Sequence, residues 1–297
     1  SARRPVNESR SVVRYRFAVL GGTGAVALVK STLAAPLALL RTLRLLRSQN
    51  VQAVNFHYPG RNALGVALLR LMGLYGGTLT VSFHGTDVRP PDGVVDRLVR
   101  RLIFNACNHI TACAPALAAR VAATYAIPPS RVSVIYNGTN IRAFRPGIMR
   151  PEGLQLPAEY IVSVGGYIAG KGHKVLIRAF GRIAAKFPAL SLVIVGMDGP
   201  ERGPLAELSR ELGIGHRVQC VTNASQSHVA GIVANAVACV QSSRVESFPL
   251  AVLEAGACGV PVVATRIDGH TDMLRDGVPA CLYVVGSDEA GAAAVAA

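Results

Sequence analysis

Two glutamates eight residues apart lie in the segment VESFPLAVLEAGACGVP, residues 245–261. Pro249 suits the first turn of a helix, which predicts that Glu246 lies in the loop before that helix and Glu254 within it. The free N–H groups at the start of the helix, near residues 248–251, can bind a diphosphate without a metal. A carboxylate accepts two hydrogen bonds from a vicinal diol, so Glu254 suits ribose hydroxyl groups. Glu246 can reach the group beyond the diphosphate, although solvation or helix capping explains either glutamate taken alone.

A glycine-rich loop with one lysine occurs in VGGYIAGKG, residues 164–172. Glycines such as Gly165 and Gly166 let the backbone approach a phosphate closely, and the helix predicted to follow offers its positive end. Lys171 adds a full positive charge. The pattern is equally typical of a simple tight turn, so it does not identify a phosphate site by itself.

One histidine, His84, follows the apolar run 78–83 in the segment SFHGTD. At the carboxyl end of a strand it can donate a hydrogen bond to a substrate, or it can be a structural loop residue.

These residues require a scaffold in which apolar strands alternate with helices. Strands are predicted over residues 51–56, 78–83, 109–113, 131–136, 159–164, 190–196, 217–221, 236–241 and 260–265. Helices are predicted over residues 61–73, 93–105, 115–125, 173–187, 203–213, 226–235 and 249–258. The pattern indicates parallel sheets covered on both faces, with ligands at the carboxyl ends of the strands. Residues 140–157 have three prolines and no periodicity, which predicts a linker.

The predicted fold class is therefore α/β, with two Rossmann-like parallel-sheet domains facing a cleft. The first is predicted over residues 1–145 and the second over 158–297. Charge separates the halves as well: residues 1–150 carry 20 Lys and Arg against 4 Asp and Glu, whereas residues 151–297 carry 11 against 13. The basic half should attract acidic partners, but no basic patch interleaved with aromatic residues favours nucleic acid.

A basic amphipathic helix is predicted near residues 33–48, where Arg41, Arg44 and Arg47 share one face. This face could lie on an anionic membrane surface or could simply be solvated. No uncharged run there reaches the ~20 residues of a spanning helix. The six cysteines show no CxxC pair, which fits a reducing cytosol. The predicted location is cytoplasmic, with the inner face of the membrane as the other possibility.

The order of SFHGTD, RVSVIYNGTNIRAFRP, VGGYIAGKG, GMDGP and SSRVESFPLAVLEAGACGVPVVAT resembles that of the family 4-like, group 1 glycosyltransferases of the GT-B fold. The resemblance runs from about Val51 to about Val285. It implies retaining transfer of a sugar from a nucleotide-diphosphate donor to a glycan or lipid-linked acceptor.

Roles for single residues follow from this resemblance. Glu254 would bind the donor ribose, Lys171 the diphosphate, and Glu246 and His84 the transferred sugar, which makes Glu246, His84 and Lys171 the catalytic candidates. The donor-binding set would be Glu254, Gly165, Gly166, Lys171, Phe248, Pro249 and Leu250. The sequence contains no Asp-x-Asp element, so neither a metal nor another cofactor is expected. Lys171 and the helix dipole would then stabilise the leaving diphosphate.

The sequence departs from the family pattern at several positions. Gly166 occupies a position where the family usually has arginine, which removes one of two cations expected at the diphosphate. Asn140 and Asp272 replace the usual aspartate and glutamate. Before Val51, AVLGGTGAV at residues 18–26 resembles the family's first glycine-rich loop only superficially. The N-terminal domain and the C-terminal helices are therefore expected to be incomplete, with weak donor binding and slow or no turnover.

Two alternatives to a transferase remain. One is a different enzyme on the same fold, such as a sugar epimerase or a phosphorylase, although the spacing of the two glutamates around SFPL disfavours it. The other is a non-catalytic or decayed nucleotide-sugar-binding fragment, motivated by Gly166 and the missing N-terminal unit.

Overall fold

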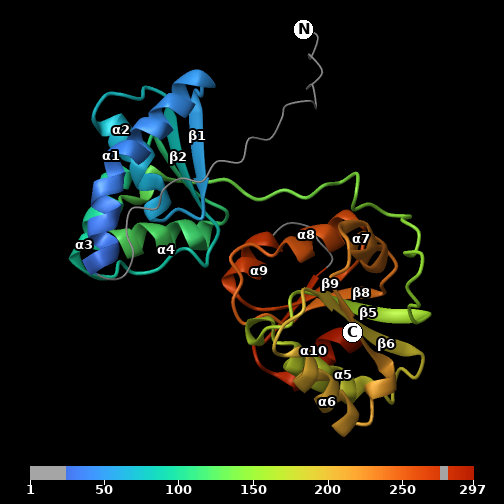
Figure 1. The fold of residues 1–297 in the computed structure, drawn as a ribbon. Helices are drawn as coiled ribbons and strands as arrows, with labels where there is room; N and C mark the ends of the chain where they lie inside the picture. Colours follow the sequence, from blue (N-terminus) through green and yellow to red (C-terminus); the bar gives the residue numbers. More distant parts are fainter. Residues whose placement is uncertain (1–24, 275–279) are drawn as a thin grey trace. The chain divides into compact units, whose positions relative to one another are not determined.

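The computed structural model describes residues 25–274 and 280–297, with side chains described from residue 35 onward. Most of the segment AVLGGTGAV, residues 18–24, lies outside the described residues. The chain divides into two compact units, one formed by residues 1–111 and 123–132 and the other by 112–122 and 133–297. Each unit contributes one sheet (Figure 1).

The first sheet has four strands in the order β1-β2-β3-β4, and β1 and β2 pair in parallel. Its strands are β1 (Ala53–His57), β2 (Thr78–Phe83), β3 (His109–Ala112) and β4 (Val132–Val134). The helices of this part of the chain are α1 (Ala25–Ser48), α2 (Leu64–Leu71), α3 (Gly93–Ala106) and α4 (Pro115–Tyr125). Residues 115–122 of α4 are among those grouped with the second unit. Strand β2 is the most deeply placed, with Leu79, Val81 and Phe83 almost fully buried. Sequential strands lie side by side, so the ends of β1 and β2 carry neighbouring loops.

The second sheet has six parallel strands in the order β10-β9-β8-β5-β6-β7. Its strands are β5 (Glu159–Val164), β6 (Leu190–Gly196), β7 (Val218–Thr222), β8 (Ala238–Gln241), β9 (Val262–Thr265) and β10 (Ala280–Tyr283). Its helices are α5 (His173–Ile183), α6 (Arg202–Glu211), α7 (Gln226–Ala234), α8 (Leu250–Ala257), α9 (Asp268–Met273) and α10 (Asp288–Ala296). The chain builds outward from β5 in one direction and then from β8 in the other. The crevice between β5 and β8 is therefore the switch point at which such sheets bind ligands.

Both faces of this sheet are buried. Side chains of β5 alternate between two hydrophobic clusters: Ile161 joins one with Phe180 of α5, and Val162 joins the other with Val252 of α8. Adjacent strand residues point to opposite faces, so a strand buried on both sides must be apolar throughout. This confirms the interpretation of the apolar runs as strands of a covered parallel sheet.

Most predicted elements are present, and the differences lie at their ends. The helix predicted at 61–73 begins with a 3-10 turn at Arg61–Ala63, and the helix predicted at 173–187 ends at Ile183. The strand predicted at 131–136 is shortened to Val132–Val134. No helix or strand occurs between β4 and β5, as predicted for residues 140–157. The predictions did not include β10, α9 or α10.

Helix α1 has the two faces that its sequence predicts. Leu46 is buried and Leu39 and Leu43 are partly buried, whereas Arg41, Arg44 and Arg47 are exposed in agreement with the stripe. Within the described residues, α1 and every other helix are too short or too polar to span a bilayer.

Candidate active site

Loops from the switch point of the second sheet bring the predicted lysine and one predicted glutamate together. The loop after β5 carries Lys171 and the loop after β8 carries Glu246, 75 residues further along the chain. Lys171 Nζ lies 2.6 Å from Glu246 Oε1. The hydroxyl of Ser243 donates to the same carboxylate oxygen at 2.7 Å. Both charged side chains are only partly exposed, so the ion pair is shielded from bulk solvent but accessible from one side.

Backbone contacts hold these two loops in register. Arg244 N donates to Gly170 O at 2.9 Å, and Ser242 Oγ donates to Lys171 O at 3.1 Å. Gly172 adopts a φ of +68°, and a Cβ atom there would overlap the carbonyl of Ser242. The glycine is therefore required by both its backbone conformation and the close approach of the second loop. This turn directs Lys171 back toward Glu246.

The glycines at the start of the loop differ in their surroundings. Gly165 contacts the aliphatic part of Lys171, so a Cβ atom there would come within 3.0 Å of the lysine side chain. At Gly166 the nearest atom to such a Cβ would be Met197 O at 3.7 Å, an ordinary contact distance. Gly166 therefore has space for a side chain. Its identity is not dictated by packing.

Two further residues, Thr265 and His270, support the loop that carries Glu246, and neither was predicted from the sequence. Thr265 Oγ1 donates to Ser243 O at 2.6 Å. His270 Nδ1 lies 2.8 Å from Thr265 O, which fixes the proton on Nδ1, and the ring is fully buried. Burial lowers the pKa of His270, partly offset by the hydrogen bond to Thr265. The neutral ring thus supports the loop that carries Glu246, and its Nε2 has no hydrogen-bond partner within the described residues.

Glu254 lies on α8, the helix that follows the loop carrying Glu246. Its carboxylate is partly buried and forms no hydrogen bond or ion pair with the residues that the structure describes. Burial raises the pKa of Glu254 to about 7. A carboxylate without protein partners is available to a ligand that donates hydrogen bonds.

The start of α8 differs from the prediction by one residue. Pro249 is the N-cap, with an extended ψ of 104°, and the helix begins at Leu250. The free N–H groups of the helix therefore begin at Leu250, because Pro249 has no N–H and Phe248 lies in the loop before the N-cap. The prediction that Pro249 lies in the first turn is corrected accordingly. Phe248 is partly buried in the preceding loop.

His84 belongs to the first unit, where it forms a cluster with residues that the sequence analysis missed. His84 Nε2 lies 2.8 Å from Nδ1 of His57, which is at the end of β1. The carboxylate of Asp87 accepts hydrogen bonds from the backbone N–H of His84 and that of Gly85. Tyr58, with a φ of +54°, places its ring 4.7 Å from that of His84. Such a backbone conformation in an aromatic residue is rare and marks a constrained loop.

Charge and protonation in this cluster favour a neutral His84. Partial burial and the charge of His57 lower the pKa of His84, and Asp87 opposes this shift. Between two nitrogen atoms 2.8 Å apart only one proton fits, so the two rings share one N–H. The chain position of His57, directly after an apolar strand, was the sequence signal that could have identified it.

No group of three or more His, Cys, Asp or Glu residues with metal-binding geometry occurs in residues 25–274 and 280–297. The structure thus gathers Lys171, Glu246 and the loop glycines at one edge of the second sheet. Glu254 follows on α8. His84 is part of a separate cluster in the first unit.

Comparison with known proteins extends these observations. The profile of the group 1 glycosyl transferases matches residues 145–297, and that of glycosyltransferase family 4 matches residues 9–143. The second match begins well before Val51, so the expectation that the preceding residues have no counterpart in the family is wrong.

Curated relatives include D-inositol 3-phosphate glycosyltransferase 2 of Catenulispora acidiphila, 32% identical over 226 residues that make up 72% of this chain and 52% of the relative. A D-inositol 3-phosphate glycosyltransferase of Mycolicibacterium paratuberculosis is 35% identical over 170 residues, which are 54% of this chain and 37% of the relative. The chain thus spans about half the length, or less, of these relatives.

Solved structures share the fold at low sequence identity. A glycosyltransferase from Rickettsia africae superimposes with a TM-score of 0.74 at 17% identity, over 93% of this chain and 77% of the other. HepE of Anabaena, in complex with UDP and glucose, superimposes with a TM-score of 0.67 at 17% identity. The match covers 88% of this chain and 71% of HepE. The two parallel-sheet units therefore have the GT-B fold. With its C-terminal 153 residues matching the group 1 profile, the chain belongs to the group 1, family 4-like glycosyltransferases.

Proposed function

We propose that this chain carries out retaining transfer of a sugar from a nucleotide-diphosphate donor to a glycan or lipid-linked acceptor. The observation that supports this most is the Lys171–Glu246 pair at the switch point of the second sheet, beside a glycine-rich loop. A cation and backbone N–H groups at this edge suit a diphosphate. The Anabaena relative in fold binds UDP and glucose, which supports the same donor chemistry here.

In this proposal each residue acts on a different part of the donor. Glu254 accepts hydrogen bonds from the ribose hydroxyl groups, and Lys171 with the N-terminus of α8 binds the diphosphate. Because negative charge grows on the diphosphate as the glycosidic bond breaks, Lys171 stabilises the transition state more than the ground state. Glu246 and His84 contact the transferred sugar. No metal or other cofactor is required by this arrangement.

The proposed location is the cytoplasm. All six cysteines fall within the described residues, and none of them forms a disulfide. Four of them are buried, as expected for structural thiols in a reducing compartment. The possibility that the basic face of α1 contacts an anionic membrane is kept as a proposal.

Binding and turnover are best tested together. Calorimetric titration with UDP-glucose and GDP-mannose measures donor affinity, and release of the free nucleotide with an acceptor panel that includes D-inositol 3-phosphate measures turnover. Lys171→Met should weaken diphosphate binding by a factor of roughly ten or more, the cost of losing one charge-assisted contact. Glu246→Gln should retain binding but reduce turnover.

A matched control lies in the same unit. Lys174 forms a similar ion pair with Glu201 at 2.8 Å, so Lys174→Met removes the same charge from outside the proposed site. Equal loss of affinity in both variants would exclude a specific role for Lys171. Donor binding without turnover for any acceptor would favour the non-catalytic alternative, and conversion of the nucleotide sugar into its epimer would favour an epimerase.

A further inference from the structure

A recess lies in the first unit, and neither His57 nor His84 lines it. It has a volume of 580 Å³ and is formed between α3 and the segment that follows α4. This is within the range of about 300–1,000 Å³ that is common for small-molecule sites. None of the residues that line it belongs to the donor site proposed above. We call it the arginine pocket, after the four arginines in its lining: Arg97, Arg100, Arg101 and Arg131.

The charge of the arginine pocket is unbalanced. Its lining contains four arginines and no aspartate or glutamate. Arg97 and Arg101 lie one turn apart on α3, and both are exposed. Neither forms a hydrogen bond or ion pair within the part of the chain that the structure describes. Their guanidinium groups therefore retain all their donors for an anionic ligand.

The other two arginines are held in place by the protein. Arg100 Nε lies 2.8 Å from Asp96 Oδ2, and Arg100 Nη1 donates to the hydroxyl of Tyr125 at 3.1 Å. Arg131 Nη2 donates to Phe104 O at 2.9 Å. Each of these arginines uses only part of its five-donor fork. They are therefore pre-positioned cations with remaining N–H groups.

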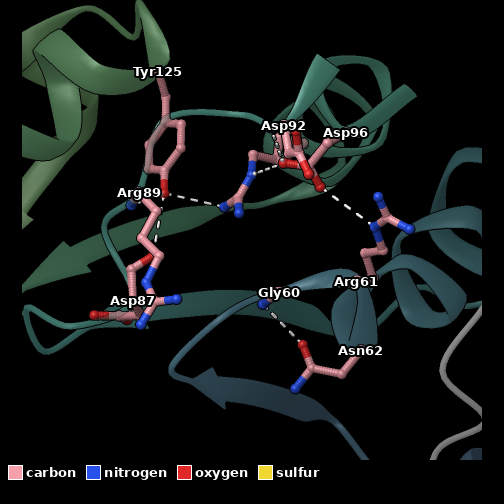
Figure 2. Close-up of polar contacts among 9 residues, drawn as sticks. Gly60, Arg61, Asn62, Asp87, Arg89, Asp92, Asp96 and Tyr125 are labelled. Carbon is pink, nitrogen blue, oxygen red and sulfur yellow. Dashed lines mark hydrogen bonds and ion pairs between the residues drawn. The ribbon is translucent and has the colours of Figure 1, made fainter. Parts of the chain in front are cut away.

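Figure 2 shows the network that fixes this arrangement. Asp96 lies between Arg61 and Arg100, with 3.4 Å to Arg61 Nε. The Tyr125 hydroxyl accepts from the backbone N–H of Arg89 at 3.2 Å. Burial disfavours the charged form of Asp96, but its hydrogen bonds and ion pairs, chiefly with Arg100, outweigh this and lower its pKa. Asp96 thus forms its ion pairs with Arg61 and Arg100 and does not line the pocket.

The floor of the pocket is apolar. The rings of Phe104 and Tyr125 lie 5.2 Å apart, and Ile127 beside them is buried. The Arg100 guanidinium lies 5.0 Å above the Tyr125 ring. A cationic rim over an aromatic floor matches a ligand with a phosphate at one end and an apolar group at the other.

We propose that the arginine pocket binds a phosphate ester of an apolar alcohol. A lipid-linked phosphate at a membrane and a soluble phosphate ester share this chemistry. The lining of this pocket shares no residue with the donor site, and the proposal does not depend on the proposed sugar transfer.

Titration with geranyl monophosphate at fixed salt tests the proposal directly. The double variant Arg97→Gln/Arg101→Gln should weaken binding by at least about tenfold, since charge-assisted hydrogen bonds contribute roughly 1.5–3 kcal/mol each. The matched control is Arg142→Gln/Arg178→Gln, which removes the same charge from exposed positions of the second unit and should leave the affinity unchanged. All four side chains are exposed, so both variants should unfold at the melting temperature of the wild type.

Two further probes define the ligand. Inorganic phosphate should bind much more weakly than geranyl monophosphate, because it does not use the aromatic floor. Vesicles of phosphatidylcholine with and without phosphatidylglycerol show whether the phosphate ester comes from a membrane lipid or from solution. Displacement of geranyl monophosphate only by the anionic vesicles supports a lipid phosphate. No displacement supports a soluble ester. No binding of geranyl monophosphate, equal loss in both double variants, or equal affinity for inorganic phosphate would overturn the proposal.

Discussion

At the scale of single residues, Gly166 is a position where the resemblance to the family implies an arginine. A Cβ atom added at this glycine would meet nothing closer than 3.7 Å, so local packing does not exclude a side chain. Arg244, in the loop that follows β8, is exposed, and its backbone N–H donates to Gly170 O. Packing at the Cβ position therefore does not require a glycine here, and the expected loss of a cation stays a prediction.

We expect Gly166→Arg to tighten binding of UDP by a factor of roughly 10 to 100, which corresponds to a charge-assisted contact of about 1.5–3 kcal/mol. Calorimetric titration measures this directly. Gly166→Gln is the control, since it adds a side chain of similar length without the charge. If both variants bind UDP equally well, or both more weakly than the wild type, the missing cation does not limit affinity.

Glu254 carries the second prediction at this scale, because burial raises its pKa to about 7. The unfolded chain releases this proton at lower pH, so the folded protein binds more protons between about pH 4.5 and 7. Stability therefore falls as pH rises through this window. We expect the melting temperature of Glu254→Gln to exceed that of the wild type above pH 7 and to approach it near pH 5.

Glu207→Gln, an exposed residue of α6, is the matched control and should show no such pH-dependent difference. A constant difference between Glu254→Gln and the wild type from pH 5 to 8 would contradict the shifted pKa.

The proposed ribose contact adds a signature in binding. Hydroxyl groups that donate to the Glu254 carboxylate favour its charged form and lower its pKa, so UDP binding near pH 7 should release protons. Calorimetry in two buffers of different ionisation enthalpy measures the number released. Glu254→Gln should abolish this release, and unchanged release would assign the proton to another group.

At the scale of elements, the loop between β5 and α5 depends on one backbone position. Gly172→Ala should destabilise the protein by at least about 2 kcal/mol, because it combines a left-handed conformation with overlap against the Ser242 carbonyl. Chemical denaturation measures this. Gly170→Ala in the same loop is the control, since nothing lies within 4 Å of its added Cβ. Equal stability of the two variants would show that the β8 loop moves aside freely.

The bounds of an element can be predicted from the sequence where a run of buried, apolar residues sets both of its ends. Strands β2, β5 and β6 have the predicted bounds because each is an apolar run between polar or glycine-rich breaks. Helix ends are less predictable, since capping competes with propensity: Pro249 is compatible with both the N-cap and the first turn. Strand β10, which directly follows residues 275–279, was not predicted from the sequence.

The sequence supplies candidate residues for the site, but it does not predict the contacts between them. Lys171, Glu246 and Glu254 were identified through the order of motifs. The ion pair between Lys171 and Glu246 joins loops 75 residues apart, and the support of Ser243 by Thr265 depends on the strand order β9-β8-β5. No local periodicity encodes such contacts, because they arise only when parallel strands place their carboxyl ends at one edge.

At the scale of the whole molecule, the two halves of the sequence differ in charge, and the two units differ in the ligands proposed for them. The first 150 residues have a net charge of +16, and the remainder −2. The arginine pocket and the His57–His84 cluster belong to the first unit, whereas all the residues proposed for the nucleotide and diphosphate belong to the second. A ligand that binds native structure stabilises the part of the protein that it contacts.

Hydrogen exchange can therefore assign the nucleotide to one unit. With UDP at about 100 times its Kd, the linkage relation gives ~2.7 kcal/mol of stabilisation. We expect slower exchange of amides in β5, β8 and α8 and little change in β1 and β2. The variant Lys171→Met at the same UDP concentration should show less protection, because it binds less nucleotide. Protection of β1 and β2 equal to that of β5 and β8 would contradict a nucleotide site built from the second unit alone, since stabilisation by binding would then extend over both sheets.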